Sequence, residues 1–291
     1  MPGIKFISDT SCDIPPDLLE KYEIDMVPFL ISLDGETYYK EYVELSVKEF
    51  YRRLRTQDAY PKTSLPPVQD FFDVFKKYHD LGHEIICFNL TSKFSASYQS
   101  AVNAKNIMLE NYPGASISVV DSEQASIGQG MLILESCRMR ENGLTSAQII
   151  ENVEKLKQNS CIYLTVDSLT YLQKGGRIGK ANALLGSLLS VKPIIAVRDG
   201  ELIPCGKIRG RAKAEAEVIR LFDRDVKENK DKYRCYVISS DLPDKAAEFS
   251  EEAVKTGGYE IERCYDIGIT IGAHIGPTVL GIGYIMKYEY L

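Results

Sequence analysis

Short apolar runs alternate along the first half of the chain with longer segments in which apolar residues recur every three or four positions. Such runs are typical of strands and helices respectively. They predict strands at 4–8, 84–89 and 116–121, and helices at 16–22, 46–55, 67–80, 123–141 and 145–159, with one more helix ending at Asn111. This alternation favours a parallel sheet whose strands are joined by crossover helices.

The second half repeats the alternation with a different spacing. It predicts strands at 161–166, 191–197, 233–239 and 259–265, separated by helices near 168–174, 179–190, 208–228 and 243–256. We place a domain boundary near Asn159, which gives an N-terminal α/β domain over 1–159 and a C-terminal α/β domain over 160–291. Since no Pro- or Ser-rich linker marks the boundary, we expect the two domains to pack closely with a cleft between them.

One segment interrupts the alternation. The runs 24–33 and 36–39 flank Asp34-Gly35, a dipeptide that suits the positive φ values of a type I′ turn. The sequence therefore predicts a β-hairpin here.

Composition excludes several classes of protein. The 35 basic residues against 41 acidic ones give a net charge of −6, which opposes nucleic acid as a partner and a role as a DNA-binding regulator. The seven cysteines include no CxxC pair, so a disulfide framework and a zinc site are disfavoured. No apolar run is long enough to span a membrane, and the N-terminus lacks the basic and apolar regions of a signal peptide. We expect a cytoplasmic protein.

Four hydroxyl-rich turns follow predicted strands: 9–11, 62–64, 91–97 and 121–122. In an open α/β sheet, ligands bind beyond the carboxyl ends of the strands, so these turns are expected to converge on one crevice. Each alone is typical of a helix N-cap. Together they favour a site that holds an anionic or polar head group with hydroxyls and helix N-terminal amides.

Two glycine-rich segments admit two interpretations each. The basic turn 174–179 follows a predicted helix rather than a strand, so it is either a phosphate cradle or a tight helix–helix turn. In 267–277 a single histidine, His274, lies among small apolar residues and is either a hydrogen-bonded core residue or a site residue. His79 and His83 are four residues apart at a helix end and are not expected to bind a metal.

The ordered set of motifs resembles the DegV family of fatty-acid-binding proteins over nearly the whole chain. The matching segments are SDTSCDIP at 8–15, KTSLP at 62–66, FSASYQSA at 94–101, VDS at 120–122, SIGQG at 126–130, YLQKGGRIG at 171–179 followed by 184–195, and GAHIGP at 272–277. The resemblance implies a two-domain α/β fold with a lipid tunnel at the domain interface. It also implies a fatty acid as ligand, no further cofactor, and a separate ATP-dependent fatty acid kinase as the partner that forms acyl phosphate.

The resemblance also implies roles for individual residues. Thr63 and Ser95 are expected to contact the carboxylate, with His274 completing the network. Ser64 and Ser97 are also expected to bind the carboxylate. The head-group vicinity is expected to include Asp9, Ser11, Gly176 and Arg177. The acyl tunnel is expected to include Ala183, Leu184, Leu188 and Ile194, although plain core is the favoured interpretation for most of these apolar positions. Arg209 and Arg211 are expected to meet the kinase.

These expectations describe a carrier without catalytic or metal-binding residues, which contacts membranes only transiently to exchange lipid. The rival interpretation is a hydrolase or transferase that acts on an acyl substrate through Ser95 and His274, with Asp9 or Asp121 as the third member of a triad. The sequence contains no GxSxG nucleophile elbow, which weakens that interpretation.

Overall fold

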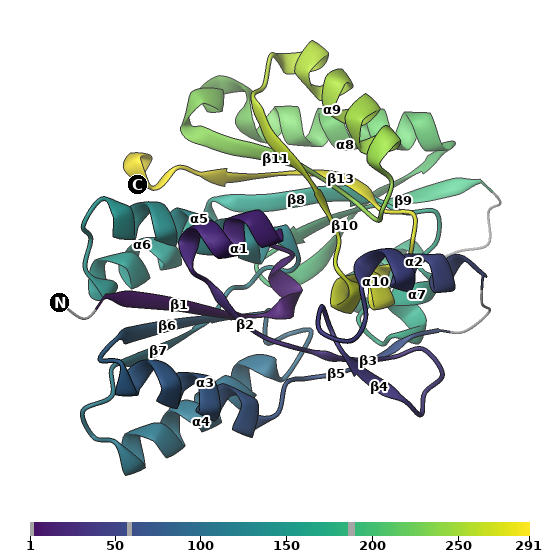
Figure 1. Ribbon diagram of the computed structural model, residues 1–291. Helices are drawn as coiled ribbons and strands as arrows, with labels where there is room; N and C mark the ends of the chain where they lie inside the picture. The colour runs from purple at the N-terminus through teal and green to yellow at the C-terminus, as the bar shows by residue number, and fades with distance from the viewer. Residues whose placement is uncertain (1–2, 57–59, 186–189) are drawn as a thin grey trace.

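The computed structural model describes residues 3–56, 60–185 and 190–291, which form three sheets with helices on their faces (Figure 1). The first is a parallel four-stranded sheet in the order β2-β1-β6-β7. Its strands are β1 (Ile4–Asp9), β2 (Asp25–Val27), β6 (Glu84–Asn89) and β7 (Ile117–Asp121). The parallel sheet predicted from the first half of the chain is thus confirmed.

Helices cover both faces of this sheet. One face packs against α3 (Val68–Asp80) and α4 (Ser97–Asn111). The other faces α5 (Ile127–Glu141), with α1 (Pro16–Tyr22) and α6 (Ser146–Gln158) beside it. Nearly every residue of α5 is buried, because this helix lies between the four-stranded sheet and the six-stranded sheet.

The six-stranded sheet has the order β10-β9-β8-β13-β11-β12. All its neighbours are antiparallel except β11 and β12, which are parallel. Its strands are β8 (Ser160–Thr165), β9 (Val191–Arg198), β10 (Glu201–Arg209), β11 (Tyr233–Ser239), β12 (Ile261–Asp266) and β13 (Leu280–Met286). Its outer face packs against α8 (Arg211–Val226) and α9 (Pro243–Gly257), and its inner face belongs to the same core as α5.

The third sheet is small and antiparallel, with β3 (Leu30–Ser32) between β4 (Tyr38–Lys40) and β5 (Lys62–Ser64). Its core includes residues of α2 (Val47–Thr56) and of α10 (Ile269–Ile275), although α10 comes from the far end of the chain. The short helix α7 (Thr170–Lys174) contacts α10. Because α10 packs against N-terminal elements, the division of the chain into domains at residue 159 stays a prediction.

The structure corrects several predicted elements. The helix predicted from residue 208 begins at Arg211, because β10 continues to Arg209 and Gly210 adopts a φ of 91°. Strands β10 and β13 and helix α10 were not predicted, and residues 62–64, predicted as a turn after a strand, are themselves strand β5. Of the helix predicted over 179–190, the described part is a 3-10 helix over Gly179–Leu184, and residues 186–189 lie outside the described residues.

The predicted hairpin is present, but its turn is not type I′. Five residues separate the paired ends of β3 and β4, and of the Asp34-Gly35 pair only Gly35 has a positive φ. The Asp34 carboxylate accepts hydrogen bonds from the backbone N–H groups of Glu36 and Thr37, which closes the wider loop.

Candidate functional site

A cavity of about 320 Å³ lies between the inner face of the six-stranded sheet and the loops that follow β5, β6 and β7. This volume is within the range of small-molecule pockets. The loops after β6 and β7 contribute Leu90, Phe94, Ser95, Ala96, Ala125 and Ser126. The cavity therefore lies beyond the carboxyl ends of parallel strands, where α/β proteins bind ligands.

Most of the wall is apolar and comes from one face of the six-stranded sheet. The residues that line this wall are Ile162 and Leu164 of β8, Val197 of β9, Leu202 of β10 and Ile238 of β11. All five are buried. Successive side chains of a strand point to opposite faces, so alternate residues of these strands reach the cavity and their neighbours reach α8 and α9. This part of the cavity offers no charge to a ligand.

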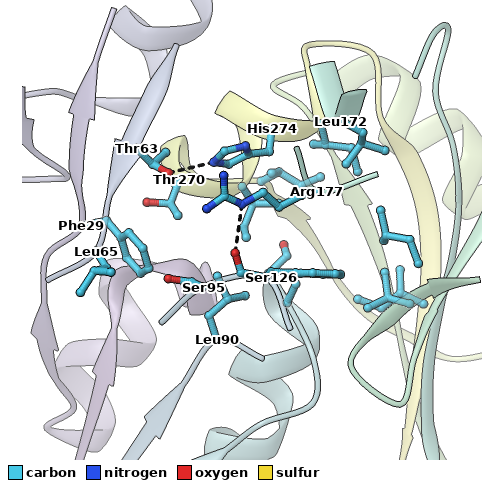
Figure 2. A pocket seen from close by; sticks show the side chains of 18 of the residues that line it. Phe29, Thr63, Leu65, Leu90, Ser95, Ser126, Leu172, Arg177, Thr270 and His274 are labelled. Atoms are coloured by element: carbon cyan, nitrogen blue, oxygen red, sulfur yellow. Dashed lines mark hydrogen bonds between the residues drawn. The ribbon is translucent and has the colours of Figure 1, made fainter. Parts of the chain in front are cut away.

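The polar groups gather at the other end of the cavity (Figure 2). The residues that line this end are Thr63 of β5, Ser95 of the loop after β6, Arg177 of the turn after α7, and Thr270 and His274 of α10. The Thr63 hydroxyl and His274 Nε2 are 2.8 Å apart and form a hydrogen bond. Hydroxyl, imidazole and guanidinium groups here face one space, which suits a single polar head group.

His274 is neutral at physiological pH. Burial, together with the positive charge of Arg177, lowers its pKa to about 4. Its Nδ1 is buried and has no hydrogen-bond partner among the described residues. We therefore assign the proton to Nε2, which donates to the Thr63 oxygen and leaves the Thr63 hydroxyl hydrogen free to donate to a ligand.

The glycine-rich turn after α7 makes room for this imidazole. A Cβ atom at Gly175 would lie 2.3 Å from His274 Nδ1, so only glycine fits. Arg177 in the same turn donates from Nε to the Phe94 carbonyl at 3.0 Å and from one Nη to the Gly175 carbonyl at 2.7 Å. No described residue bonds its other Nη. The turn is thus both a close helix–helix connection and the source of the cation in the cavity.

Other predicted head-group residues lie outside the cavity. Asp9, Ser11 and Ser97 are fully buried in a hydrogen-bonded network beside it. Asp9 Oδ1 accepts from Ser11 and Gln129, and Asp9 Oδ2 accepts from Ser97 at 2.7 Å and from Asn89. These hydroxyls bond to protein and do not face a ligand.

Ala183, Leu184 and Ile194, the described residues among those predicted for the tunnel, do not line the cavity either. Val197 of β9 points into the cavity. Ile194 is three positions earlier in the same strand, so it points to the opposite, outer face, where it is buried. Ala183 is exposed, Leu184 packs against the core beside the cavity, and Leu188 lies outside the described residues. Of the remaining predicted residues, Ser64 lines the cavity and is exposed.

Gly176 is exposed with a φ of 72°, and it does not line the cavity. Arg209 is exposed at the end of β10. Arg211 opens α8 and donates to Glu215 and to the Thr278 carbonyl.

Two polar residues of the cavity, Ser126 and Thr270, were not predicted from the sequence. Ser126 precedes α5 with a φ of 55° and donates to the buried Asp13 at 2.5 Å. Thr270 is buried one helical turn before His274. That spacing of four residues was the available signal, but the helix itself was not predicted.

The arrangement does not assemble a hydrolytic triad within the described residues. His274 bonds Thr63 rather than Ser95, and its Nδ1 faces no carboxylate. Asp9 is enclosed in its own network, and Asp121 accepts from the Ser92 backbone. The described residues contain no cluster of His, Cys, Asp and Glu that could hold a metal ion. None of the helices described is long and apolar enough to cross a membrane.

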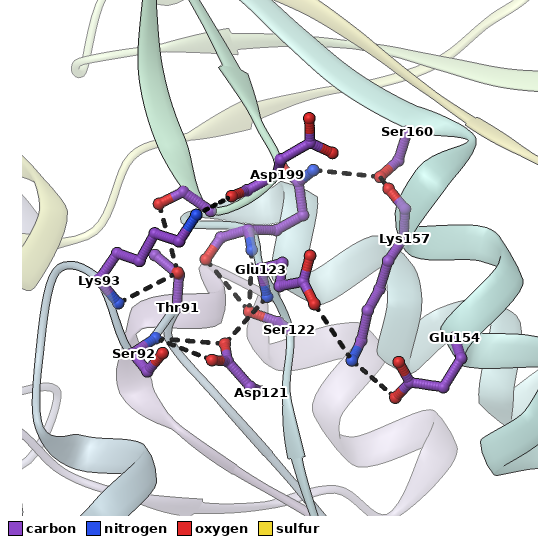
Figure 3. A network of polar contacts seen from close by, with 12 residues as sticks. Thr91, Ser92, Lys93, Asp121, Ser122, Glu123, Glu154, Lys157, Ser160 and Asp199 are labelled. Carbon is purple, nitrogen blue, oxygen red and sulfur yellow. Dashed lines mark hydrogen bonds and ion pairs between the residues drawn. The ribbon is translucent and has the colours of Figure 1, made fainter. Parts of the chain in front are cut away.

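A second polar contact joins the six-stranded sheet to the loops that line the cavity (Figure 3). The turn between β9 and β10 contains Asp199 and Gly200, and the Gly200 N–H donates to the Glu123 carbonyl at 2.8 Å. Lys93 donates to the Asp199 carbonyl, also at 2.8 Å, and the Thr91 hydroxyl donates to the Gly200 carbonyl. This contact fixes the loops after β6 and β7 against the sheet.

The family model described as uncharacterised proteins of the DegV family matches residues 3–287. Protein DegV of Bacillus subtilis is 32% identical over 289 residues, which cover 98% of this chain and all of that protein. A stearic-acid-binding protein from Eubacterium ventriosum has a similar structure, with a TM-score of 0.95, 38% identity, and coverage of 99% of this chain and 100% of that one. A fatty-acid-binding DegV family protein from Thermus thermophilus superposes with a TM-score of 0.88 at 29% identity, covering 98% and 99% of the two chains.

Proposed function

Since the chain belongs to the DegV family, we propose that it binds one long-chain fatty acid in this cavity, with the carboxylate at the polar end. The observation that supports the proposal most strongly is the division of one cavity into a long apolar wall and a single polar end. A fatty acid has the same division. The similar protein from E. ventriosum is described as binding stearic acid.

The apolar wall accounts for affinity. Burying an acyl chain of about 16 carbons at roughly 0.8 kcal/mol per CH₂ gives a gross gain on the order of 12 kcal/mol. A hydrogen bond to a carboxylate contributes only about 1.5–3 kcal/mol. The acyl chain therefore provides most of the binding free energy, and the polar end sets which way round the ligand lies.

The polar end offers donors to both carboxylate oxygens. Thr63 has a free hydroxyl hydrogen because it accepts from His274, and Ser95 lies on the same side of the cavity. Arg177 adds a positive charge, and its two bonds to backbone carbonyls hold it in place. Neutral hydroxyl donors leave the carboxylate oxygens more nucleophilic than a two-bond arginine pair would.

We further propose that the protein presents this carboxylate to an ATP-dependent fatty acid kinase, which forms the acyl phosphate. The polar end lies nearer to solvent than the apolar wall does, because Ser64 is exposed and Thr63 half-buried, while Ile162 and Val197 are buried. Arg209 is exposed on the end of β10 and is available to a partner. The protein itself supplies no catalytic residue in this scheme.

Denaturing extraction of the freshly purified protein, followed by mass spectrometry, tests the first proposal. The expected result is about one fatty acid per chain. The double variant Thr63→Ala/Ser95→Ala should lose at least tenfold in affinity for added fatty acid, while Ser92→Ala, which removes an exposed hydroxyl of the neighbouring loop, should bind as the wild type does. A protein that is empty and indifferent to fatty acids would contradict the proposal.

The kinase proposal has its own test. Arg209→Ala should retain its bound fatty acid and lose acyl phosphate formation when mixed with a fatty acid kinase and ATP. Loss of the lipid itself would place Arg209 in the binding site instead. Unchanged acyl phosphate formation would remove Arg209 from the partner surface.

A further inference from the structure

A buried carboxylate lies directly behind the polar end of the cavity. Glu41, just after β4, is 0% exposed. It accepts hydrogen bonds from the Thr10 hydroxyl at 2.5 Å, from the Thr270 hydroxyl at 2.5 Å and from the Thr270 backbone N–H at 2.8 Å. Thr270 also lines the cavity. A single side chain therefore separates the Glu41 carboxylate from the place proposed for the ligand's carboxylate.

No cation compensates Glu41 among the described residues. The groups that face it from the neighbouring segments are Asp13, which follows β1, and Tyr42, the next residue of its own chain segment. Asp13 is buried as well, and its Oδ1 has no partner among the described residues. In the cavity beyond Thr270, His274 is neutral and Arg177 supplies the positive charge.

These surroundings disfavour a negative charge on Glu41. Burial, only partly offset by the hydrogen bonds from Thr10 and Thr270, raises the pKa of Glu41 to about 7. The pKa of Asp13 is also raised, first by burial and then by the charge of Glu41. The Glu41 side chain is thus close to its titration midpoint at physiological pH.

The Thr270 hydroxyl has one hydrogen, and Glu41 accepts it. While Glu41 is ionised, Thr270 offers only lone pairs to the cavity, and these repel a ligand carboxylate. When Glu41 gains a proton, it can donate to the Thr270 oxygen. The Thr270 hydrogen is then free to point to the ligand.

Building on the proposed function, we propose that Glu41, acting through Thr270, couples binding of the fatty-acid carboxylate to uptake of one proton from solvent. The ligand binds as its anion, the proton taken up resides on Glu41, and the net charge of the buried pair of carboxylates stays at −1. Glu41 is then a positioning residue, and Thr270 is the group that contacts the ligand. Linkage requires the affinity to fall as pH rises, by up to tenfold per pH unit above the midpoint of the free Glu41.

The experiment is calorimetric titration of the lipid-free protein with palmitate at about pH 8, in phosphate and in Tris. These buffers differ in ionisation enthalpy, so the difference in measured heat counts the protons exchanged. The wild type should take up between half a proton and one proton per palmitate bound. Glu41→Gln should still bind and should exchange close to none, because glutamine does not titrate.

A second pair of variants tests the route through Thr270. Thr270→Ser keeps the hydroxyl and should keep the proton uptake, whereas Thr270→Val should lose it together with the pH dependence of the affinity. Asp13→Asn is the control for the neighbouring carboxyl and should keep the uptake. This set remains informative if Glu41→Gln does not fold.

The outcomes separate the two proposals. Proton uptake that persists in Glu41→Gln or in Thr270→Val, or that disappears only in Asp13→Asn, overturns the role of Glu41 and leaves fatty acid binding intact. Wild-type binding with no proton exchange also overturns it. Absence of palmitate binding by the wild type instead overturns the proposed function.

Discussion

Two clusters of polar residues near the cavity are built from the same kind of hydroxyl-rich turn, yet they differ in how fully they are hydrogen-bonded. In the cluster around Asp9, both carboxylate oxygens are surrounded by donors, including Ser11, Ser97 and the Leu90 backbone N–H. At the polar end of the cavity, His274 Nδ1 has no partner among the described residues. The first cluster uses its bonding capacity within the protein, and the second retains capacity for a ligand.

The largest expected effect concerns the cluster around Asp9, whose hydrogen-bonding groups are used within the protein. Asp9→Ala removes the acceptor of five hydrogen bonds, and among the described residues it leaves the buried Ser97 hydroxyl and Leu90 N–H without an acceptor. We expect the free energy of unfolding of the lipid-free protein to fall by about 3–5 kcal/mol, measured by urea denaturation. Thr63→Val, at the polar end of the cavity, removes the acceptor of one hydrogen bond, the one from His274 Nε2, and should lower it by only about 1–2 kcal/mol. Equal losses in the two variants would erase the distinction between the clusters.

The second prediction uses the pH dependence of stability. The pKa of His274 is lowered to about 4 in the folded protein, against an ordinary value of 6.5, so the unfolded chain binds the proton more tightly. Neutral His274 therefore favours the folded state by roughly 3 kcal/mol in the free energy of unfolding above pH 6.5. This stabilisation is lost as the pH drops from about 6.5 to 4. His274→Gln should lack this part of the pH dependence.

The matching measurement is an NMR titration, in which the His274 ring signals should change with a midpoint near pH 4. His79 lies in α3 and His83 just after it; both are half-buried and neither lines the cavity, so their ring signals are assigned separately from that of His274. A His274 midpoint near 6.5 would mean that the imidazole is solvated. It would contradict the assignment of a neutral imidazole that donates from Nε2 to Thr63.

The third prediction concerns Arg177, the cation at the polar end of the cavity. Arg177→Met removes the positive charge and keeps most of the apolar stem, so palmitate affinity should fall by about 10- to 100-fold. Arg177→Lys should restore part of the affinity, because it returns the charge without the guanidinium geometry. An affinity equal to the wild type in Arg177→Met would exclude Arg177 from the head-group site.

The smallest effect is expected at Gly176, the residue before Arg177. Gly176 has a φ of 72° and open space at the position of a Cβ atom. Gly176→Ala should therefore cost about 1–2 kcal/mol of stability through backbone strain alone, with palmitate affinity unchanged. A loss of affinity with little loss of stability would return Gly176 to the head-group site where the sequence suggested it.

The contrast between the clusters also explains what the sequence could predict. Hydrophobic periodicity predicted the parallel sheet and most helices, and the motifs pointed to Thr63, Ser95, Arg177 and His274, which the structure brings to one cavity. The sequence could not separate Ser95 from Ser97, because both follow the same strand and only tertiary contacts decide that Ser97 bonds Asp9.

The apolar wall was predicted less well, for two physical reasons. The apolar runs of β9 are buried on both faces of the sheet, so their sequence does not say which residues reach the cavity. Ile194, expected to be either tunnel lining or plain core, lies in the core on the outer face. Thr270 and Glu41 were missed because their contact joins residues that are 229 positions apart in the chain. No local pattern indicates such a pairing.

The most direct test of the central claim is a crystal structure of the protein loaded with a fatty acid. We expect the carboxylate within hydrogen-bond distance of the Thr63 and Ser95 hydroxyls, with the acyl chain against Leu164 and Val197. The claim would be contradicted by a fatty acid in the reverse orientation, with its methyl end at His274, or by an acyl chain bound outside this cavity.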